Sequence, residues 1–435
     1  MATRTRALNR LSATEAAKAI AAGEIKSEAL VEACLDRIAE RDATLHAWVF
    51  VDRELALKQA RAGAKGVLGG IPVGVKDVID TADMPTEYGS VLHKGHRPAK
   101  DSACVAATRG AGGVILGKTA TTEFASPWQK GVRNPHDLER TPGVSSSGSA
   151  AAVADFHVPL AFGTQTGGST VRPAAYCGIY GLKASLDGID RGGIRHLKPS
   201  IDTLGVFARS LDDVALFMAG LTGKPTASLD LPAGTKPRIG ICRTPEWDKA
   251  EPATVEAIER SKKALEKVGA AVDEVSVPHG FDDVMHAFRI ITTRENLRTL
   301  MDEINRGEET LNPWIREGLA AARQVGPTDY EFANVGAGFY RRRFAATFET
   351  HDALLTPSAN GEAPKGLEGA TLGAFNSFWT WMYGPALNIP AFTGPNKMPI
   401  GVTLVGKQGE DARLLATARW IERAIGSDKG PIALA

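Results

Sequence analysis

Three short segments of this 435-residue chain carry side chains that could catalyse acyl transfer. In residues 163–183 (GTQTGGSTVRPAAYCGIYGLK), Ser169 follows two glycines and precedes an Arg-Pro pair. Residues 141–152 (TPGVSSSGSAAA) form a serine-rich turn, and an apolar run upstream contains Lys76 and Asp77. The three segments supply a candidate nucleophile, a second hydroxyl and an amine base, but none contains a histidine.

Ser169 follows a turn that could stabilise a negatively charged intermediate. Gly167 and Gly168 lack a Cβ, so the chain can turn sharply just before the serine. Successive backbone N–H groups in such a turn can point to one spot and form an anion-binding nest. Beside a nucleophilic serine, that nest would hold the oxyanion of an acyl-transfer intermediate. Taken alone, however, a Gly-Gly-Ser tripeptide is more often a turn without a chemical role.

The serine-rich turn and Lys76 could complete a proton-transfer chain. Residues 145–149 (SSSGS) hold more serines than one helix N-cap at Ser149 needs, so a spare hydroxyl could relay a proton. Lys76 interrupts an apolar, strand-like run, which by composition alone favours an edge residue that reaches solvent. A buried lysine has a lowered pKa and can accept a proton through a serine. Asp77, its neighbour in the strand, would point to the opposite face.

Composition and motifs exclude several other classes of protein. A net charge of +1 gives no indication of binding to nucleic acid or to an anionic membrane. Four cysteines without a CxxC, and no short Cys/His cluster, predict reduced thiols and no metal site. The chain has no membrane-length apolar run and no signal-peptide core, so a cytoplasmic location is expected. The GxSxG, SxxK and HExxH motifs and the glycine-rich nucleotide loops are absent.

The elements that must position these residues alternate between strands and helices. Residues 238–242, 252–268 and 271–277 form a predicted β-α-β unit, which favours parallel pairing. Residues 281–350 are predicted to be helical and hold many arginines, and strands resume at 352–356. Because helices and strands interleave to the end of the chain, one intertwined α/β domain is expected.

Taken together, the segments resemble the amidase signature family. Residues 70–80 look like the lysine strand of that family, 134–149 like its serine-rich turn and 163–183 like its nucleophile block. Further similar blocks and the overall coverage are residues 84–90, 116–125 and 202–210, with a strong match over about 11–220 and a second match over 379–422.

The resemblance implies a role for each matching residue. Ser169 would be the acyl-enzyme nucleophile, Ser145 a bridging serine with an unusual cis peptide bond, and Lys76 the base that later protonates ammonia. The oxyanion hole would be formed by backbone N–H groups, those of Thr166, Gly167, Gly168 and Ser169. The implied fold is α/β, the amidase-signature fold, with a large mixed and mostly parallel sheet and helices on both faces. No metal and no organic cofactor are implied.

The chain departs from the family pattern at a few positions. Gln165 stands where an aspartate is usual, and Val144 and Ser147 stand where glycines are usual. Arg172 lies three residues after the nucleophile, whereas many members have an arginine two residues after it. The shifted arginine resembles that of short bacterial malonamidase-type members, in which it holds a substrate carboxylate, a geometry that arginine suits. Pairing of Arg172 with a protein carboxylate, which would only order the loop, is an equally good interpretation.

The expected organisation is a single amidase domain over residues 1–435. Its core would comprise about 11–280 and 351–425, and the helical segment at about 281–350 would shape the substrate pocket. That segment is polar and basic, which favours a small polar or anionic amide over a fatty amide. The residues behind this view are His286, Arg289, Arg294, Asn296, Trp314, Tyr340, Arg341, Arg342 and Arg343.

The leading functional hypothesis is an amidohydrolase that cleaves the C–N bond of a small polar or anionic carboxamide or ureide and releases ammonia. The alternative is the glutaminase-like subunit of a tRNA-dependent amidotransferase complex. A third interpretation, an inactive binding protein on this scaffold, is disfavoured because Lys76, Ser145 and Ser169 are all present. The expected partners are a small-molecule amide substrate and a second copy in a homodimer, with no nucleic acid and no membrane.

Overall fold

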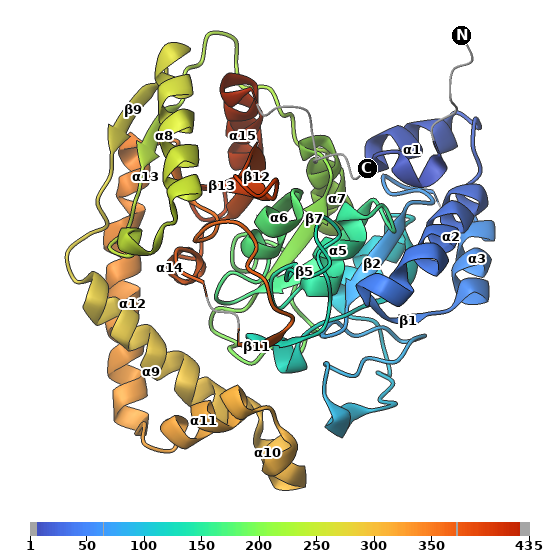
Figure 1. Cartoon of the computed structure of the whole chain (residues 1–435), viewed down its shortest axis with the longest axis horizontal. Helices are drawn as coiled ribbons and strands as arrows, with labels where there is room; N and C mark the ends of the chain where they lie inside the picture. Colours follow the sequence, from blue (N-terminus) through green and yellow to red (C-terminus); the bar gives the residue numbers. More distant parts are fainter. Residues whose placement is uncertain (1–6, 64, 371–372, 427–435) are drawn as a thin grey trace.

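An 11-stranded sheet runs through the middle of the molecule, in the order β1-β3-β2-β5-β7-β6-β12-β13-β10-β8-β9 (Figure 1). The computed structural model describes residues 7–63, 65–370 and 373–426. A separate two-stranded sheet pairs β4 with β11. The strands are β1 (Trp48–Val51), β2 (Pro72–Lys76), β3 (Val114–Thr119), β4 (Trp128–Lys130), β5 (Leu160–Gln165), β6 (Tyr180–Lys183), β7 (Thr203–Ala208), β8 (Arg238–Ile241), β9 (Ala271–Glu274), β10 (Ala353–Pro357), β11 (Glu368–Ala370), β12 (Ala386–Thr393) and β13 (Pro399–Val405).

The predicted α/β fold with a large mixed sheet is confirmed. β2 pairs in parallel with β3 and β5, and β8 pairs in parallel with β9 and β10. The predicted β-α-β unit is β8, helix α8 (Pro252–Lys267) and β9. Between these groups, from β5 to β10, adjacent strands are antiparallel, so parallel pairs are fewer than the sequence led us to expect. The direct connection from β12 to β13 is one cause, because a short link joins antiparallel neighbours.

Helices cover both faces of the sheet. On β5, the ring of Phe162 lies 4.8 Å from that of Phe217 in α7, whereas Gly163 faces Ser146 at the start of α5. Successive strand residues point to opposite faces, so α5 and α7 lie on opposite sides. The helices are α1 (Ala13–Ala21), α2 (Ser27–Leu45), α3 (Arg53–Arg61), α4 (Ala103–Gly110), α5 (Ser147–Ala154), α6 (Val171–Cys177), α7 (Leu211–Thr222), α8 (Pro252–Lys267), α9 (Phe281–Thr299), α10 (Met301–Gly307), α11 (Pro313–Ala322), α12 (Pro327–Ala345), α13 (Thr347–Thr350), α14 (Asn376–Trp381) and α15 (Asp411–Ile425).

Residues 281–350 form the helices α9 to α13, which run along one side of the molecule (Figure 1, yellow to orange). α9 packs against both α11 and α12. Aromatic contacts join these helices to α14, because Phe288 stacks on Trp381 with ring centroids 3.5 Å apart and Phe344 meets Phe378 edge to face. The helices therefore form a wall beside the sheet.

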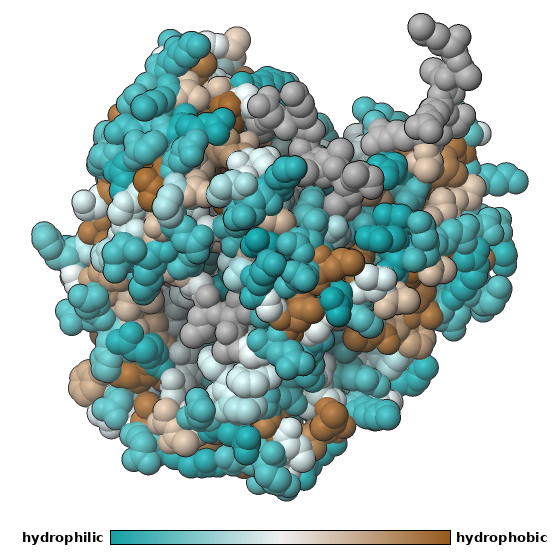
Figure 2. Space-filling model, in the orientation of Figure 1, coloured by the Kyte–Doolittle hydropathy of each residue, from teal (hydrophilic) through white to brown (hydrophobic). Residues whose placement is uncertain are grey.

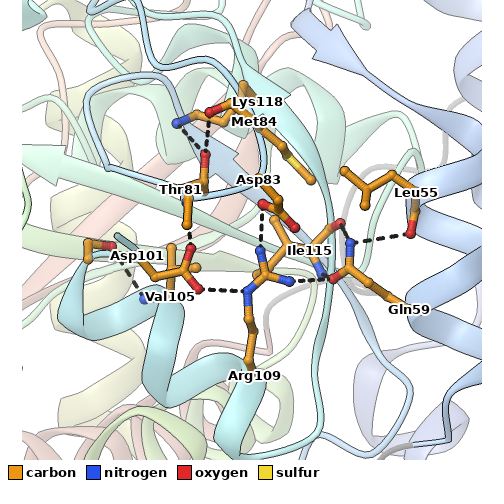
Figure 3. Close-up of polar contacts among 12 residues, drawn as sticks. Leu55, Gln59, Thr81, Asp83, Met84, Asp101, Val105, Arg109, Ile115 and Lys118 are labelled. Atoms are coloured by element: carbon orange, nitrogen blue, oxygen red, sulfur yellow. Dashed lines mark hydrogen bonds and ion pairs between the residues drawn. The ribbon is translucent and has the colours of Figure 1, made fainter. Parts of the chain in front are cut away.

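A polar network centred on Arg109 fixes the loop that follows β2 (Figure 3). The guanidinium of Arg109 donates from Nε to Asp101 at 2.9 Å, from Nη2 to Asp83 at 2.8 Å and from Nη1 to Gln59 at 2.7 Å. Gln59 in turn donates to the backbone carbonyl of Ile115 at 3.2 Å. The network ties α3, α4 and β3 to the loop that follows Lys76.

The surface is polar over most of the face shown in Figure 2, with hydrophobic residues in scattered patches. All four cysteines are buried and free, as the sequence predicts for reduced thiols. Among the described residues, no helix combines the length and the apolar character needed to cross a membrane.

Candidate active site

Lys76 is the last residue of β2 and is fully buried. Because β2 lies between β3 and β5, Lys76 is in the interior of the sheet and not at its edge. Its Nζ donates to Ser145 Oγ at 2.8 Å, to Ser146 Oγ at 2.9 Å and to Thr164 Oγ1 at 2.8 Å. Burial lowers the pKa of Lys76 to about 7, against the weaker opposing effect of the Asp202 charge. A large fraction of the amine is therefore neutral at physiological pH.

Asp77 does not pair with Lys76. Its carboxylate lies 3.7 Å from Nζ of Lys118, a second fully buried lysine, on the opposite face of the sheet. Lys118 lies beside Val75 in the register of β2 and β3, one residue out of step with Lys76. The expectation that adjacent side chains diverge is met, so the Asp77 charge does not hold Lys76 in its protonated form.

The serine-rich turn precedes α5, and its hydroxyl groups have different partners. The Val144–Ser145 peptide bond is cis, the unusual bond that the resemblance implied. Ser146 is the N-cap residue of α5, and its Oγ also accepts from the backbone N–H of Thr164 at 3.3 Å. Ser149, which the sequence suggested as a cap, lies inside α5 and donates to the carbonyl of Phe162 at 2.6 Å. Two serine hydroxyls, and not one, therefore contact Lys76.

Ser169 lies in the turn between β5 and α6, with 8% of its surface exposed. Nη2 of Arg172, at the start of α6, donates to the carbonyl of Val144 at 3.1 Å. This bond holds the Ser169 turn against the Ser145 turn. Among the described residues, no hydrogen bond is formed by Ser169 Oγ, whereas Lys76 and Ser145 are directly bonded. Catalytic hydrogen bonds are often long without substrate and tighten in the complex.

The glycine-rich turn presents unused backbone donors beside Ser169. The N–H groups of Gly167, Gly168 and Ser169 donate to no other residue in the described part of the chain. Gly168 has a φ of +127°, in the region that favours glycine, and a Cβ there would lie 3.0 Å from Cβ of Asn376. This backbone geometry can hold an anion.

Gln165 holds the turn in place of the aspartate usual in the family. Its Oε1 accepts from the backbone N–H groups of Thr170 at 2.9 Å and Val171 at 3.0 Å. Its Nε2 donates to Thr380 Oγ1 at 3.1 Å, a bond that a carboxylate could not donate. Next to it, the Thr166 hydroxyl donates to Asp202. The Gln165 substitution therefore keeps the acceptor that orders the turn.

Arg172 has no acidic partner among the described residues. Its side chain is 4% exposed, and its Nε is buried without a hydrogen-bond partner in that part of the chain. Burial lowers the pKa of the guanidinium, and the nearby Tyr176 opposes that shift. The interpretation in which Arg172 pairs with a protein carboxylate therefore has no support in the described geometry.

A cavity of about 350 Å³ opens beside Ser169, Thr166, Gly167 and Arg172. Of the residues singled out in 281–350, the sequence hypothesis named only three that line this cavity, Arg289, Asn296 and Trp314. The remaining wall is more apolar than that hypothesis implied. The lining residues that α9, α11 and α14 add are Met285, Phe288, Thr292, Thr293, Gly318, Ser377 and Trp381.

Some site residues were missed by sequence reasoning. Ser146 and Thr164 contact Lys76, and the number of serines in the turn was the only signal for the first. Lys198 lines the cavity, but it lies in a loop that carried no motif of its own. Alternation along β5 assigns Thr164 to one face of the strand, but it does not show that this side chain meets Lys76.

Comparison with known proteins identifies the family. A family model described as Amidase matches residues 29–415. The chain belongs to the amidase family. It is an enzyme that hydrolyses amides, and the amidase signature fold and the family resemblance seen in the sequence are confirmed.

Two curated relatives are subunits of glutamyl-tRNA(Gln) amidotransferases. That of Acidothermus cellulolyticus is 36% identical over 81% of this chain and 80% of the relative, and that of Salinispora arenicola is 32% identical over 96% and 98%. Among solved structures, peptide amidase from Stenotrophomonas maltophilia has a TM-score of 0.84 at 28% identity, covering 97% of this chain and 98% of that one. A vestigial protein complex that reveals the origins of an s-triazine catabolic enzyme contains a chain with a TM-score of 0.86 at 25% identity, covering 97% and 100%.

The predicted partners are wrong. The sequence led us to expect a small-molecule amide substrate and a homodimer, with no nucleic acid and no membrane. The curated relatives are instead named as one subunit of an amidotransferase with a tRNA in its name. The balanced charge of a single subunit misled that prediction, because it carries no information about the surfaces of its assembly. The relatives also favour the alternative function, the glutaminase-like subunit of an amidotransferase, over the leading one.

Proposed function

We propose that this chain is the ammonia-releasing, glutaminase-like subunit of an amidotransferase-type assembly, with the carboxamide of glutamine as its amide donor. The match of the curated relatives over nearly the whole chain is the observation that carries this proposal. The buried Lys76 beside Ser145 supplies the chemistry that such a subunit needs.

In the proposed mechanism, neutral Lys76 takes the proton of Ser145, and Ser145 takes that of Ser169. The freed Ser169 Oγ attacks the carboxamide carbon and forms a C–O bond, while the C=O electron pair moves to the oxygen. The unused N–H groups of the glycine-rich turn stabilise this oxyanion, in a site largely shielded from water. The N–H groups proposed for this role are those of Thr166, Gly167, Gly168 and Ser169.

The second half of the reaction returns the proton. The Lys76 ammonium protonates the leaving nitrogen through Ser145, the C–N bond breaks and ammonia departs. Water then attacks the acyl-enzyme, and the same three groups carry its proton to Ser169 Oγ as the acid is released. A pKa of about 7 suits Lys76 to this double role, because it accepts and returns a proton at similar cost near neutral pH.

Substrate binding is proposed to involve Arg172 and the helical segment 281–350. Arg172 lines the cavity beside Ser169 and has a buried Nε without a partner among the described residues, so a substrate oxygen could accept from it. The residues of α9 and α11 in the cavity wall would shape the space for the acyl chain.

The test measures ammonia release from glutamine by the purified chain, first by itself and then with the other amidotransferase subunits of the same organism. We expect slow release by the chain by itself, stimulation by the partner subunits, and loss of release by at least about 10⁴-fold in Ser169→Ala with an unchanged circular dichroism spectrum. Full activity of Ser169→Ala would refute the nucleophile. Fast hydrolysis that partner subunits leave unchanged would refute the amidotransferase function.

A second candidate is an amidohydrolase of an anionic carboxamide. One observation favours it, namely that Arg172, Lys198 and Arg289 line the cavity whereas no aspartate or glutamate is among its described lining residues. The α-ammonium of glutamine would find no carboxylate there. Faster hydrolysis of glutaramate, which is glutamine without its amino group, would distinguish this candidate from the first.

A further inference from the structure

Lys198 differs from the other buried lysines in having no hydrogen-bond acceptor. Lys76 and Lys118 each donate to three oxygen atoms, and Lys183 donates to the carbonyl of Ala184 at 2.9 Å. Lys198 is 9% exposed, yet its Nζ has neither a hydrogen bond nor an ion pair with any residue of the described ranges. A buried ammonium without an acceptor is costly, so the acceptor must come from outside the protein.

The Lys198 side chain opens onto the cavity that also contains Ser169. Its one specific side-chain contact among the described residues is with the ring of Trp314, 5.9 Å from Nζ, which is a weak cation–π interaction. Nζ thus lies between an aromatic wall and the space where the acyl part of an amide would lie.

The main chain at Lys198 is fixed to the catalytic turn. Its N–H donates to Asp202 at 2.9 Å, and its carbonyl accepts from the N–H of Asp202 at 2.8 Å. The same Asp202 side chain accepts from the hydroxyl of Thr166 in the glycine-rich turn. The position of Lys198 relative to the turn that carries Ser169 is therefore built into the fold, and is not that of a mobile surface lysine.

The acidic residues that could neutralise Lys198 have other partners. Asp202 is occupied by Thr166 and by the backbone of Lys198 itself. Glu295 accepts from Ser200 Oγ at 3.0 Å and from the Tyr330 hydroxyl at 3.0 Å. Both carboxylates act on Lys198 only at long range, and burial lowers its pKa more than they raise it.

We propose that Lys198 binds a carboxylate on the acyl part of the amide substrate. This inference rests on the proposed function in one respect, that the amide substrate occupies the cavity beside Ser169. Both candidate donors carry such a carboxylate. Arg172 has one of its nitrogens committed to the carbonyl of Val144, so it is assigned a contact nearer the scissile bond, and Lys198 is left for the anionic end.

The kinetic test uses two amides of equal chain length, glutaramate with a terminal carboxylate and pentanamide with a methyl group in its place. We expect Lys198→Met to lower kcat/KM for glutaramate by at least about tenfold, mainly through KM, as for loss of a hydrogen bond to a charged group. Pentanamide should change by less than about threefold, and Lys198→Arg should recover much of the loss. An equal loss for both amides, or no loss for glutaramate, would overturn the proposal.

Lys183→Met is the matched control, because Lys183 is equally buried but does not line the cavity. It should leave the preference for glutaramate over pentanamide unchanged. A second measurement, binding of glutarate by calorimetry, does not need turnover. Glutarate bound at least about tenfold more weakly by Lys198→Met supports the inference even if no amide is hydrolysed, and equal binding by both proteins contradicts it. Failure of the hydrolysis alone counts against the proposed function.

Discussion

Replacing Thr164 with valine removes one of the three oxygen atoms that surround Lys76 Nζ. The ammonium form donates to all three hydroxyls, whereas the neutral amine has two N–H donors and one lone pair. Loss of a hydrogen bond to a charged group costs about 1.5–3 kcal/mol, and loss of a neutral one costs about 0.5–1.5 kcal/mol. The variant therefore destabilises the ammonium by about 1.4 kcal/mol more than it destabilises the amine, which corresponds to about one pKa unit.

The pKa of Lys76 should consequently fall from about 7 to roughly 6 in Thr164→Val. Because the neutral amine is the proposed base, the acid limb of kcat/KM should move to lower pH by the same amount. At pH 6, activity relative to the high-pH plateau should rise from about a tenth to about a half. The measurement is a pH profile of kcat/KM from pH 5 to 9, followed by ammonia release.

Thr108→Val is the control, because Thr108 is equally buried but donates to the carbonyl of Cys104 in α4, away from Lys76. Its acid limb should stay where that of the parent enzyme lies. An acid limb that stays in place or moves to higher pH in Thr164→Val would refute the view that this hydroxyl stabilises the charged form of the base. Equal loss of activity at every pH would show that Thr164 acts only in packing.

Two further predictions concern the turn and the second buried lysine. Gly168→Ala should lower kcat by at least about 10²-fold, because its φ of +127° is strained for alanine and its donors hold the oxyanion, whereas Gly167→Ala should be milder; equal effects in steady-state assays would contradict this. Lys118→Met should lower the free energy of unfolding by about 3 kcal/mol, because it leaves Asp77 buried without its cation. Burial raises the pKa of Asp77 to about 6, so this loss should be largest above pH 6, where the carboxylate is ionised, and smaller at pH 5. Urea titrations at pH 5 and 8 test it, and equal losses would contradict the reasoning.

The sequence predicted the fold class and the segments that converge on Lys76, because the lysine strand, the serine-rich turn and the glycine-rich turn each have a distinctive local pattern. It could not decide from the apolar run whether Lys76 was at an edge. That depended on β3 and β5, which pair with β2 from positions far along the chain. Composition also gave no warning of the antiparallel middle of the sheet, since strand direction depends on connections.

The cavity wall was harder to predict for a physical reason. α9 packs on α11, α12 and α14 as well as lining the cavity, so its apolar residues have several possible faces to cover. Phe288 is one such residue, stacked on Trp381 from another segment. Lys198 meets Trp314 from a distant part of the chain, and no local pattern records that contact.

The groups that break the bond and the groups that enclose the acyl chain come from different stretches of polypeptide. The former are supplied by β2, β5 and the turns before α5 and α6, and the latter largely by α9 and α11. Exchange of side chains on α9 or α11 can therefore retarget the enzyme without disturbing how its nucleophile is generated. Divergent members of such a lineage would keep one reaction while accepting very different acids.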